Sequence, residues 1–266
     1  MEDEGMKLYP PLSRRFFRVW QRNLTVYRQS WKISFIPPLL EPLFYLLAFG
    51  IGLGGLVGNI RYGGVEISYV RFIAPALIAI TVMNSSFFEN TYGSFVRMYY
   101  QKTFDAMMAT PLTVEEIIAG EIIWGATKAV IATAIMMVVI SFFGLIRYPE
   151  GLLLLPLAFL GGLAFGAAGM ICTALVPNIE LFNLPVFLFI TPLFLFSGTF
   201  FPVENLPGWA QTTAAFLPLT RLVDLSRAFT NGRIDAGLLP GIGYLAAFAA
   251  VTFPLALYKM RKRLIK

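Results

Sequence analysis

Long apolar runs separated by short polar stretches dominate the pattern of this chain. Six of these runs reach the length of about 20 residues that a membrane-spanning helix needs. They lie near residues 33–57, 69–92, 117–143, 151–176, 181–201 and 236–258. The runs are too long and too little alternating for the strands of a membrane barrel. The pattern therefore predicts an all-α integral membrane protein with six transmembrane helices, because a helix satisfies its own backbone groups inside lipid.

Basic residues fall mainly on one side of the predicted bundle. The segment before the first run holds seven, the segment after the last run holds five, and the loop between the second and third runs adds Arg97 and Lys102. Cytoplasmic segments carry an excess of Lys and Arg, so both termini are expected on the cytoplasmic side. Six basic residues fall on the other side, but three of them lie in one long loop, where the rule is weak.

Composition favours a membrane protein over a soluble one. Hydrophobic residues make up 57% of the 266 residues and charged residues only 14%, against about 25% charged in soluble domains. The net charge of +6 would also suit nucleic-acid binding. The basic residues cluster where membrane topology requires them, so we expect no nucleic-acid partner. The chain has no histidine and one cysteine, Cys172, and we expect no catalytic residue, no metal site and no internal disulfide.

Residues 12–31 are the first of three notable segments outside the runs. Apolar residues, Trp20 among them, recur there at helical spacing. Arg14, Arg18 and Arg22 follow an i, i+4 stripe on another face. This pattern predicts an amphipathic helix in the cytoplasmic interface, with its aromatic side chains toward the membrane and its arginines toward lipid headgroups. A simple topology anchor would carry a similar set of positive residues.

The loop at residues 93–116 is the second segment. Residues 98–109 suit a short helix, which Thr110-Pro111 would end because the residue before a proline avoids the helical region. Its apolar positions are Met98, Phe104, Met107 and Met108. Thr113 and Glu116 fit a capping box that opens the third run. Such a helix would either dock another protein or merely connect two spans and pack against the bundle, and the spacing leaves both readings open.

The third segment, residues 202–235, is apolar but is cut by prolines into pieces too short to span a membrane. Broken backbone at membrane depth survives only where protein covers it or where it lines a wet cavity. We therefore predict two short re-entrant or interfacial helices near 207–217 and 220–229 on the outer side, with Trp209 as an interfacial anchor. Three charged residues of the second helix share a face and are spaced for pairing, namely Arg221, Asp224 and Arg227.

Four charged residues lie inside or at the edge of the apolar runs, namely Glu41, Glu89, Glu121 and Lys128. The topology places the three glutamates toward the cytoplasmic ends of their spans and Lys128 deeper. A charge within a bilayer costs about 2.5–3.5 kcal/mol, so such residues usually pair or line a pathway. They predict a polar cytoplasmic vestibule that admits a headgroup. Interface placement with snorkelling side chains is the alternative, and a proton relay is disfavoured because nothing polar continues across the membrane.

Two stretches resemble those of a known family, the permease subunits of ABC-2 type exporters. Residues 102–112, KTFDAMMATPL, resemble the cytoplasmic coupling segment of that family. Residues 197–202, SGTFFP, followed by Leu206-Pro207, Trp209 and Pro218-Leu219, resemble its signature after the fifth span. The resemblance covers essentially the whole chain in order, so residues 1–266 are expected to form one transmembrane domain. The detail is most similar to the subgroup that exports lipooligosaccharides such as nodulation factors.

The resemblance implies an exporter of the bacterial or archaeal cytoplasmic (inner) membrane that is driven by a partner ATPase. Two copies of this chain would pair with two copies of a separate nucleotide-binding subunit, which would bind ATP and Mg, so this chain would hold no cofactor. The sequence has no Gly-x-x-x-x-Gly-Lys-[Ser/Thr] phosphate loop, in agreement with that division. The ATPase would dock on Lys102, Thr103, Phe104, Asp105, Met108, Thr110 and Pro111. The outer gate would comprise Pro202, Leu206, Pro207 and Trp209.

Stripes of small residues mark close helix contacts in two spans. One stripe is Gly50, Gly54 and Gly58 in the first span, and the other is Ala158, Gly162 and Gly166 in the fourth. Packing within the chain is the default expectation for either. The resemblance implies a dimer seam along the first and fifth spans, which favours the first stripe as the one that faces the second copy.

Two other classes compete with an ATP-driven permease. A self-sufficient secondary transporter would show internal repeats and midplane charges, but residues 33–143 and 151–258 show no convincing repeat and only Lys128 lies deep. A membrane enzyme acting on lipid-linked sugars would need carboxylates or histidines clustered at one interface. The carboxylates are scattered along the sequence, which disfavours that class.

Overall fold

Helices make up most of this protein. The computed structural model describes residues 13–53, 58–62 and 64–265, apart from the side chains of residues 33, 34, 37, 38, 41, 42, 50, 51 and 53. The helices are α1 (Phe16–Gln29), α2 (Trp31–Tyr45), α4 (Tyr69–Phe88), α5 (Thr103–Met108), α6 (Val114–Phe142), α7 (Leu154–Leu175), α8 (Asn183–Pro185), α9 (Thr191–Phe196), α10 (Gly208–Phe216), α11 (Pro218–Thr230) and α12 (Leu239–Leu264). Short 3-10 and π-helical turns extend several of them, notably at Leu46–Leu53, Glu89–Gly93 and Val96–Tyr100.

Five helical stretches within the described ranges are long and apolar enough to cross a membrane. They are Tyr69–Tyr100, Val114–Phe142, Glu150–Leu175, Ile179–Phe196 and Ala236–Leu264. These stretches coincide with the second to sixth predicted spans and confirm a helical, multi-pass architecture. The predicted first span, 33–57, begins as α2 and continues as π-helical turns to Leu53. Because residues 54–57 lie outside the described part, a sixth span stays a prediction.

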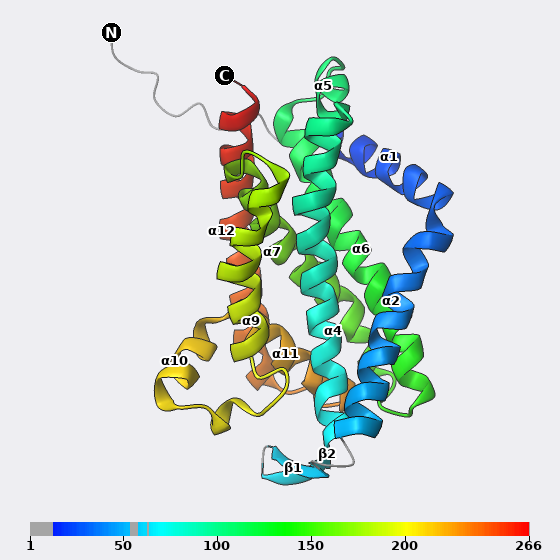
Figure 1. Ribbon diagram of the computed structural model, residues 1–266, viewed down its shortest axis with the longest axis vertical. Helices are drawn as coiled ribbons and strands as arrows, with labels where there is room; N and C mark the ends of the chain where they lie inside the picture. The colour runs from blue at the N-terminus through cyan, green and yellow to red at the C-terminus, as the bar shows by residue number, and fades with distance from the viewer. Residues whose placement is uncertain (1–12, 54–57, 63, 266) are drawn as a thin grey trace.

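The long helices stand side by side (Figure 1). α4, α6 and α7 pack against one another, and α12 packs along α7. α5 and the last turns of α12 lie at one end of this bundle, and the two strands lie at the opposite end (Figure 1). We call these the α5 end and the hairpin end.

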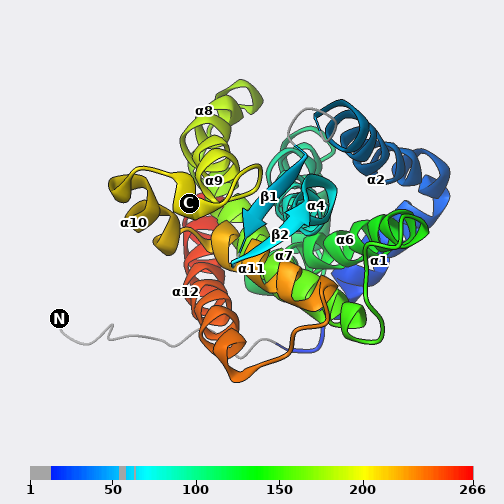
Figure 2. The ribbon, with the colours of Figure 1, turned by 90° about the horizontal axis from the view of Figure 1, so that it is seen from below.

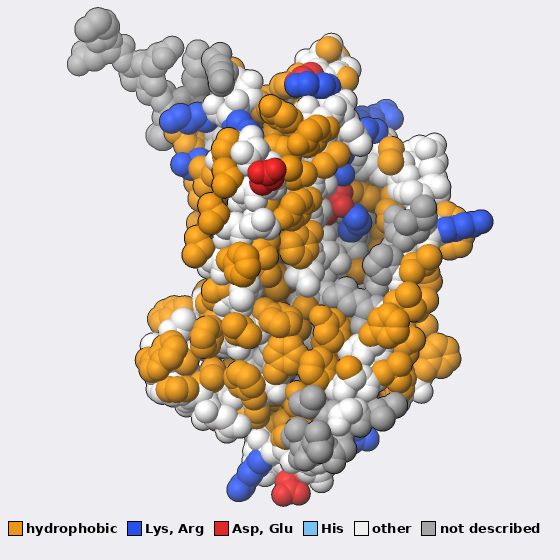
Figure 3. Space-filling model, in the orientation of Figure 1, with side chains coloured by type: hydrophobic (Ala, Val, Ile, Leu, Met, Phe, Trp, Pro, Cys, Tyr) orange, Lys and Arg blue, Asp and Glu red, His pale blue; other side chains and the backbone are white. Residues whose placement is uncertain are grey.

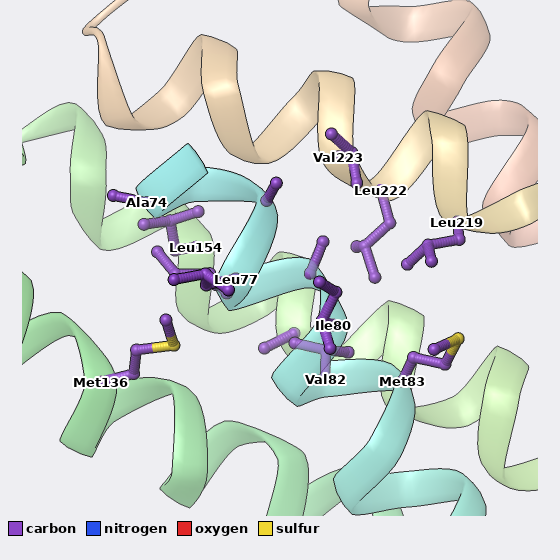
Figure 4. Packing of buried hydrophobic residues seen from close by; sticks show 14 of the residues in the cluster. Ala74, Leu77, Ile80, Val82, Met83, Met136, Leu154, Leu219, Leu222 and Val223 are labelled. Atoms are coloured by element: carbon purple, nitrogen blue, oxygen red, sulfur yellow. The ribbon is translucent and has the colours of Figure 1, made fainter. Parts of the chain in front are cut away.

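α4 and α11 share the larger apolar core of the bundle. Phe72 and Ile73 of α4 are completely buried, as are Leu222 and Val223 of α11. Figure 4 shows apolar side chains of the two helices facing one another, with Met136 of α6 close by. These apolar contacts pack α11 closely against the bundle.

α10 and α11 are the two short helices that were predicted near 207–217 and 220–229. Pro207 directly precedes α10, and Pro218 occupies the first turn of α11, where its missing N–H is not needed. Seen from below, α11 crosses the end of the bundle, whereas α10 projects to one side (Figure 2). Whether either helix re-enters a membrane stays a prediction.

A two-stranded hairpin precedes α4, which the all-α prediction did not include. β1 (Asn59–Tyr62) and β2 (Val65–Ser68) are antiparallel, with Ile60 opposite Ile67 and Tyr62 opposite Val65. Tyr62 packs edge-on against the ring of Phe72 in α4, with 5.4 Å between the ring centroids. The hairpin is therefore docked on the end of α4.

Two of the spans leave most of their apolar surface uncovered by the rest of the chain. Only 17% of the most apolar window is buried in each of Ile179–Phe196 and Ala236–Leu264, against 72% in Tyr69–Tyr100. Figure 3 shows the resulting band of hydrophobic side chains along the bundle. Lipid or another protein must cover these faces in a membrane.

The predicted stripe of small residues in the fourth span packs inside the chain. A Cβ at Gly162 of α7 would lie 2.7 Å from Cα of Ala126 in α6, so the two backbones approach closely there. Ala158, which begins the stripe, is fully buried. In the first-span stripe, Gly54 and the environment of Gly50 lie outside the described residues.

Candidate functional site

A network of buried charges lies toward the α5 end, between α4, α6 and α1. It unites three of the four residues predicted to form a vestibule. Arg97 bridges two carboxylates, with Nη1 2.7 Å from Oε1 of Glu89 and Nη2 2.6 Å from Oε2 of Glu121. Lys128 Nζ lies 2.7 Å from the other oxygen of Glu89. The side chain of Glu41, the fourth predicted member, lies outside the described residues.

Local helix geometry brings these groups together. The helix of α4 continues through the π-helical turns to Tyr100, so Glu89 and Arg97 project from one continuous helix. π-helical turns inside helices are frequent at functional sites. A Cβ at Gly93 would lie 3.3 Å from the Glu89 carboxylate, so a small residue is needed there. α6 supplies Glu121 and Lys128 from two turns of the same face.

Every carboxylate oxygen of the network has a partner. Glu89 Oε1 accepts hydrogen bonds from Arg97 and from the indole of Trp124, at 2.7 and 3.1 Å. Glu121 Oε2 accepts from Arg97 and from the hydroxyl of Ser94, at 2.6 and 2.8 Å. The Glu121 side chain is completely buried. A buried carboxylate is tolerated only when it is paired and hydrogen-bonded in this way, so the network stabilises the arrangement of α4 against α6.

α1 completes the network from a third direction. Asn23 Nδ2 donates to Oε1 of Glu121 at 2.8 Å, and Arg22 Nη1 donates to Oδ1 of Asn23 at 2.8 Å. Trp20 Nε1 donates to Thr127 Oγ1 of α6 at 2.9 Å. α1 lies within the segment 12–31 that was predicted to be an amphipathic helix, and it ends at Gln29. Residue 12 lies outside the described part, and placement of α1 in a membrane interface stays a prediction.

The side chains of α1 differ in direction from the prediction. Arg14 and Arg18 are exposed, as a basic outer stripe requires. Arg22 is half-buried and donates to Asn23 instead of standing on the exposed basic stripe, and Asn23 is buried. The inner face of α1 thus carries polar groups that α6 satisfies, which anchors α1 to the bundle.

A cavity of about 420 Å³ opens beside the network. Its lining combines the cations Arg22, Arg97 and Lys128 with the rings of Tyr27 and Trp124. Figure 3 shows basic and acidic side chains inside a hollow between α4 and α1. A concave site with a few placed polar groups and aromatic walls suits the polar part of an amphipathic molecule.

The segment predicted for coupling is only partly exposed. The expected helix 98–109 is broken at Gln101 and Lys102, where Lys102 adopts a left-handed φ of 54°, and α5 covers Thr103–Met108 alone. Phe104 is completely buried and Met107 nearly so, which corrects the expectation that Phe104 contacts a partner. Phe104 instead anchors α5 to the bundle, because α5 is too short to be stable without such packing.

The other coupling candidates form an outward rim. Lys102 and Asp105 expose 66% and 58% of their side chains and lie 4.0 Å apart. Thr110 and Pro111 are exposed as well, whereas Thr103 and Met108 are half-buried. A charged rim on a short anchored helix is a suitable docking surface for another protein.

α1 also touches the coupling segment directly. Arg15 Nη1 donates to the carbonyl of Pro111 at 2.8 Å, and Ser13 donates to the carboxylate of Glu116. Glu116 belongs to the predicted capping box, which is confirmed: its backbone N–H donates to Thr113 Oγ1, and its side chain accepts from the Thr113 N–H. The rim and the buried network therefore share α1 and α6 as common supports.

The residues predicted for an outer gate lie at the opposite end and do not converge. Pro202 is buried, Leu206 is half-buried and Pro207 is exposed. Trp209 exposes 66% of its surface and contacts the ring of Phe196, with 5.9 Å between the centroids. An exposed tryptophan at this level suits an interfacial anchor.

The predicted pairing of Asp224 with its neighbouring arginines is wrong for the described residues. Arg227 instead donates to the carbonyls of Gly198 and Phe72, at 2.6 and 3.4 Å. Arg221 donates to the carbonyl of Ala215 at 3.1 Å. Backbone carbonyls outcompete Asp224 here because Arg227 points into the bundle, beneath the Phe72 ring.

Comparison with known proteins gives a consistent result. The profile of a family described as ABC-2 type transporter matches residues 14–229. Nodulation protein J of Rhizobium leguminosarum bv. trifolii is 37% identical over 266 residues, which cover 100% of this chain and of that protein. Nodulation protein J of Rhizobium meliloti (strain 1021) is 37% identical over 265 residues, covering 97% and 99%. Inner membrane transport permease YadH of Escherichia coli (strain K12) is 22% identical over 245 residues, covering 92% and 93%.

Proposed function

Because the chain belongs to the ABC-2 type transporter family, we propose that it is the membrane-spanning permease subunit of an ATP-driven exporter. The exporter moves a lipid-linked or amphipathic substrate, such as a lipooligosaccharide, a polysaccharide or a drug, outward across the cytoplasmic membrane. ATP and Mg are bound by a separate nucleotide-binding subunit. The working complex contains two copies of that subunit and two copies of this chain.

One observation carries this proposal, the physical link between the α5 rim and the buried network. The rim formed by Lys102, Asp105, Thr110 and Pro111 is exposed, whereas Phe104 fixes α5 to the bundle. Phe104 packs in one apolar cluster with residues of α6, and Arg15 at the start of α1 donates to the carbonyl of Pro111. A displacement of the rim would therefore move both α6 and α1. Both helices carry residues of the network, Asn23 in α1 and Glu121 in α6. A partner that hydrolyses ATP can therefore act on the polar centre of the bundle without entering it.

The α5 end faces the cytoplasm in this proposal. The basic residues of α1 and of the end of α12 gather there, and Arg261 pairs with Glu115 at 2.9 Å. Cytoplasmic segments are enriched in such residues. This orientation places the cavity beside Lys128 on the side from which an exporter takes its cargo.

The cavity supports an amphipathic cargo. Its cations and aromatic rings suit a polar headgroup, while the hollow opens along the apolar face that acyl chains would follow. Relatives named Nodulation protein J support the subgroup that the sequence resembles, in which lipooligosaccharides are exported.

A second copy of the chain would cover apolar faces that are otherwise bare. Phe44 of α2 exposes 61% of its surface, and Phe187 and Leu188 of the fifth predicted span expose 70% and 76%. α2 and α9 stand at separate corners when the bundle is seen from its end (Figure 2). A symmetric pair would bury such faces and enclose a route for cargo between the copies.

Reconstitution tests the proposal. Inverted proteoliposomes containing this chain, with or without a nucleotide-binding subunit from the same source, are loaded from outside with a fluorescent lipooligosaccharide. We expect uptake only when both proteins and ATP are present. The matched control is a partner variant that lacks the lysine of its phosphate loop. Uptake by this chain alone on a proton gradient would instead establish a secondary transporter.

A further inference from the structure

A larger cavity lies at the hairpin end, far from the coupling rim. Its volume is about 570 Å³, and it lies between the β-hairpin and the C-terminal part of α11. Tyr62 and Ile67 contribute from the hairpin. Three arginines from separate segments line it, namely Arg147, Arg227 and Arg233. None of the contacts proposed above for coupling or headgroup entry uses this cavity.

The arginines of this cavity form no salt bridge with any described residue, unlike Arg97 and Lys128 of the buried network. The ion pairs of the described chain are Arg97 with Glu89 and Glu121, Lys102 with Asp105, Lys128 with Glu89, and Arg261 with Glu115. The cavity holds three arginines against two carboxylates, Asp224 and Asp235, and none of these arginines forms a salt bridge within the described ranges.

Arg227 is held rigidly and forms no salt bridge within the described part of the chain, although Asp224 lines the same cavity. It is only 4% exposed, and its guanidinium lies over the rings of Phe72 and Tyr62, at 3.8 and 5.1 Å from the centroids. Its hydrogen bonds to the carbonyls of Gly198 and Phe72 are with neutral groups. A fixed guanidinium whose hydrogen-bond acceptors are neutral carbonyls favours a nearby anion, because no solvent reorganisation is needed to receive it.

The turn after α11 fixes the position of Arg147. Gly232 has a φ of +69°, and a Cβ there would lie 2.5 Å from Cδ of Arg147. The Arg147 backbone N–H donates to the carbonyl of Thr230 at 2.9 Å. The loop after α6 and the turn after α11 are thus bound together, which brings Arg147 to the cavity that Arg233 also lines.

Two aspartates also line the cavity, so the cavity is not uniformly basic. Asp224 and Asp235 face three arginines. Burial raises the pKa of Asp224 above its usual value, while the charges of Arg227 and Arg221 act in the opposite direction. Carboxylates beside arginines accept hydrogen bonds from hydroxyl groups, which suits an anion carried on a hydroxylated molecule.

We propose that the hairpin-end cavity binds an oxyanion, a phosphate or carboxylate group, through Arg147, Arg227 and Arg233. Planar guanidinium groups match the oxygens of such groups with paired hydrogen bonds. The anion arrives either as a free ion or as the headgroup of an anionic lipid. This inference does not depend on the exporter assignment, because binding is measured on the purified chain.

The test uses the full chain in nanodiscs. Calorimetric titration with inorganic phosphate in phosphatidylcholine nanodiscs detects a free anion. Thermal stability in nanodiscs with and without phosphatidylglycerol detects a lipid headgroup. We expect saturable binding in at least one arm, and we expect Arg147→Gln with Arg233→Gln to weaken it by about tenfold or more, as loss of charge-assisted hydrogen bonds requires.

Two further variants keep this test decisive. Gly232→Ala displaces Arg147 without removing a charge and should also weaken binding. Arg61→Gln removes an exposed arginine from β1 at the same end, outside the cavity lining, and should leave binding unchanged. Absence of saturable binding in both arms, or equal loss in Arg61→Gln, overturns the proposal.

Discussion

Asn23 of α1 donates a hydrogen bond to Glu121 of α6 at 2.8 Å, across 98 positions of sequence. Glu121 is completely buried, so its Oε1 has no water to replace this donor. α1 therefore belongs to the helical bundle and is more than a strip of basic residues on its surface. Removing α1 would leave a buried carboxylate oxygen without a partner, which is costly in a low-dielectric interior.

Arg97→Ala should destabilise the fold severely. The substitution removes the ion-pair partner of Glu121 and one of the two partners of Glu89, while both carboxylates stay buried. Loss of one member of a buried ion pair costs about 3–5 kcal/mol. The midpoint of thermal unfolding in detergent, followed by the fluorescence of the folded protein on size exclusion, measures the effect.

A second substitution separates charge from packing. Glu121→Gln added to Arg97→Ala removes one stranded charge, so the double variant should recover part of the lost stability. A double variant as unstable as Arg97→Ala would show that the loss came from packing of the arginine side chain.

Asp105→Arg should uncouple ATP hydrolysis from transport while leaving the chain folded. Asp105 is exposed on α5, so the substitution changes the charge of the docking rim without touching the core. We expect export in the assembled complex to fall at least about tenfold, as repulsion within an interface of matched charges can produce. Glu66→Arg, an exposed carboxylate on β2 at the hairpin end, is the matched control and should export normally.

Phe104→Ala should act differently from Asp105→Arg. Phe104 is completely buried, and truncation of a buried phenylalanine costs about 3–5 kcal/mol. We expect a lowered unfolding temperature of the chain alone, before any partner is added. Thermal unfolding of the isolated chain measures this, and an unchanged midpoint together with lost export would return Phe104 to the docking surface.

Gly125→Ala should disturb the contact of α4 with α6. A Cβ at this position would lie 2.0 Å from Nδ2 of Asn90, which Gly166 of α7 confines from the other side. Overpacking of this kind costs about 1–3 kcal/mol. Gly243→Ala in α12 is the control, since nothing lies within 4 Å of its Cβ and alanine favours the helix by about 0.5–1 kcal/mol. Equal unfolding temperatures for the two variants would contradict the close packing.

Cysteine labelling tests the orientation of the bundle. In a Cys172→Ala background, Thr212→Cys in α10 should react with a membrane-impermeant thiol reagent from outside the cell, because Thr212 is exposed at the hairpin end. Lys102→Cys at the α5 end should react only in inverted vesicles. The reverse pattern would overturn the topology. If the partner drives export as proposed, reactivity of Thr212→Cys should also change when the partner is trapped with nucleotide, because outer gating would then follow cytoplasmic energy input.

The long apolar runs allowed most of the architecture to be predicted. Five spans, the capping box of Thr113 and Glu116, and the helix pair after Pro207 all follow from local signals that tertiary packing does not override. The hairpin was missed although Gly63-Gly64 is flanked by alternating apolar residues, a recognised hairpin signal.

Some residues at the centre of the buried charge network were predicted from the sequence, and others were not. Glu89, Glu121 and Lys128 were identified because charges are rare in apolar runs, but Arg97 was assigned to a loop. The span expected to end at residue 92 continues to Tyr100, and that extension places Arg97 two helical turns from Glu89. Asn23 carried no signal of its own, because only the docked position of α1 reveals that it is buried.

The spans of this protein differ in length, so we expect them to respond differently to the thickness of the bilayer. Ile179–Phe196 has 18 residues and is mostly bare of protein contacts. At about 1.5 Å per residue it extends about 27 Å, slightly less than the hydrocarbon layer of a typical membrane of about 30 Å. The well-packed Val114–Phe142, with 29 residues, exceeds that thickness comfortably. We therefore expect thicker membranes to strain the short span more than the packed core, so that acyl-chain length acts mainly on one helix.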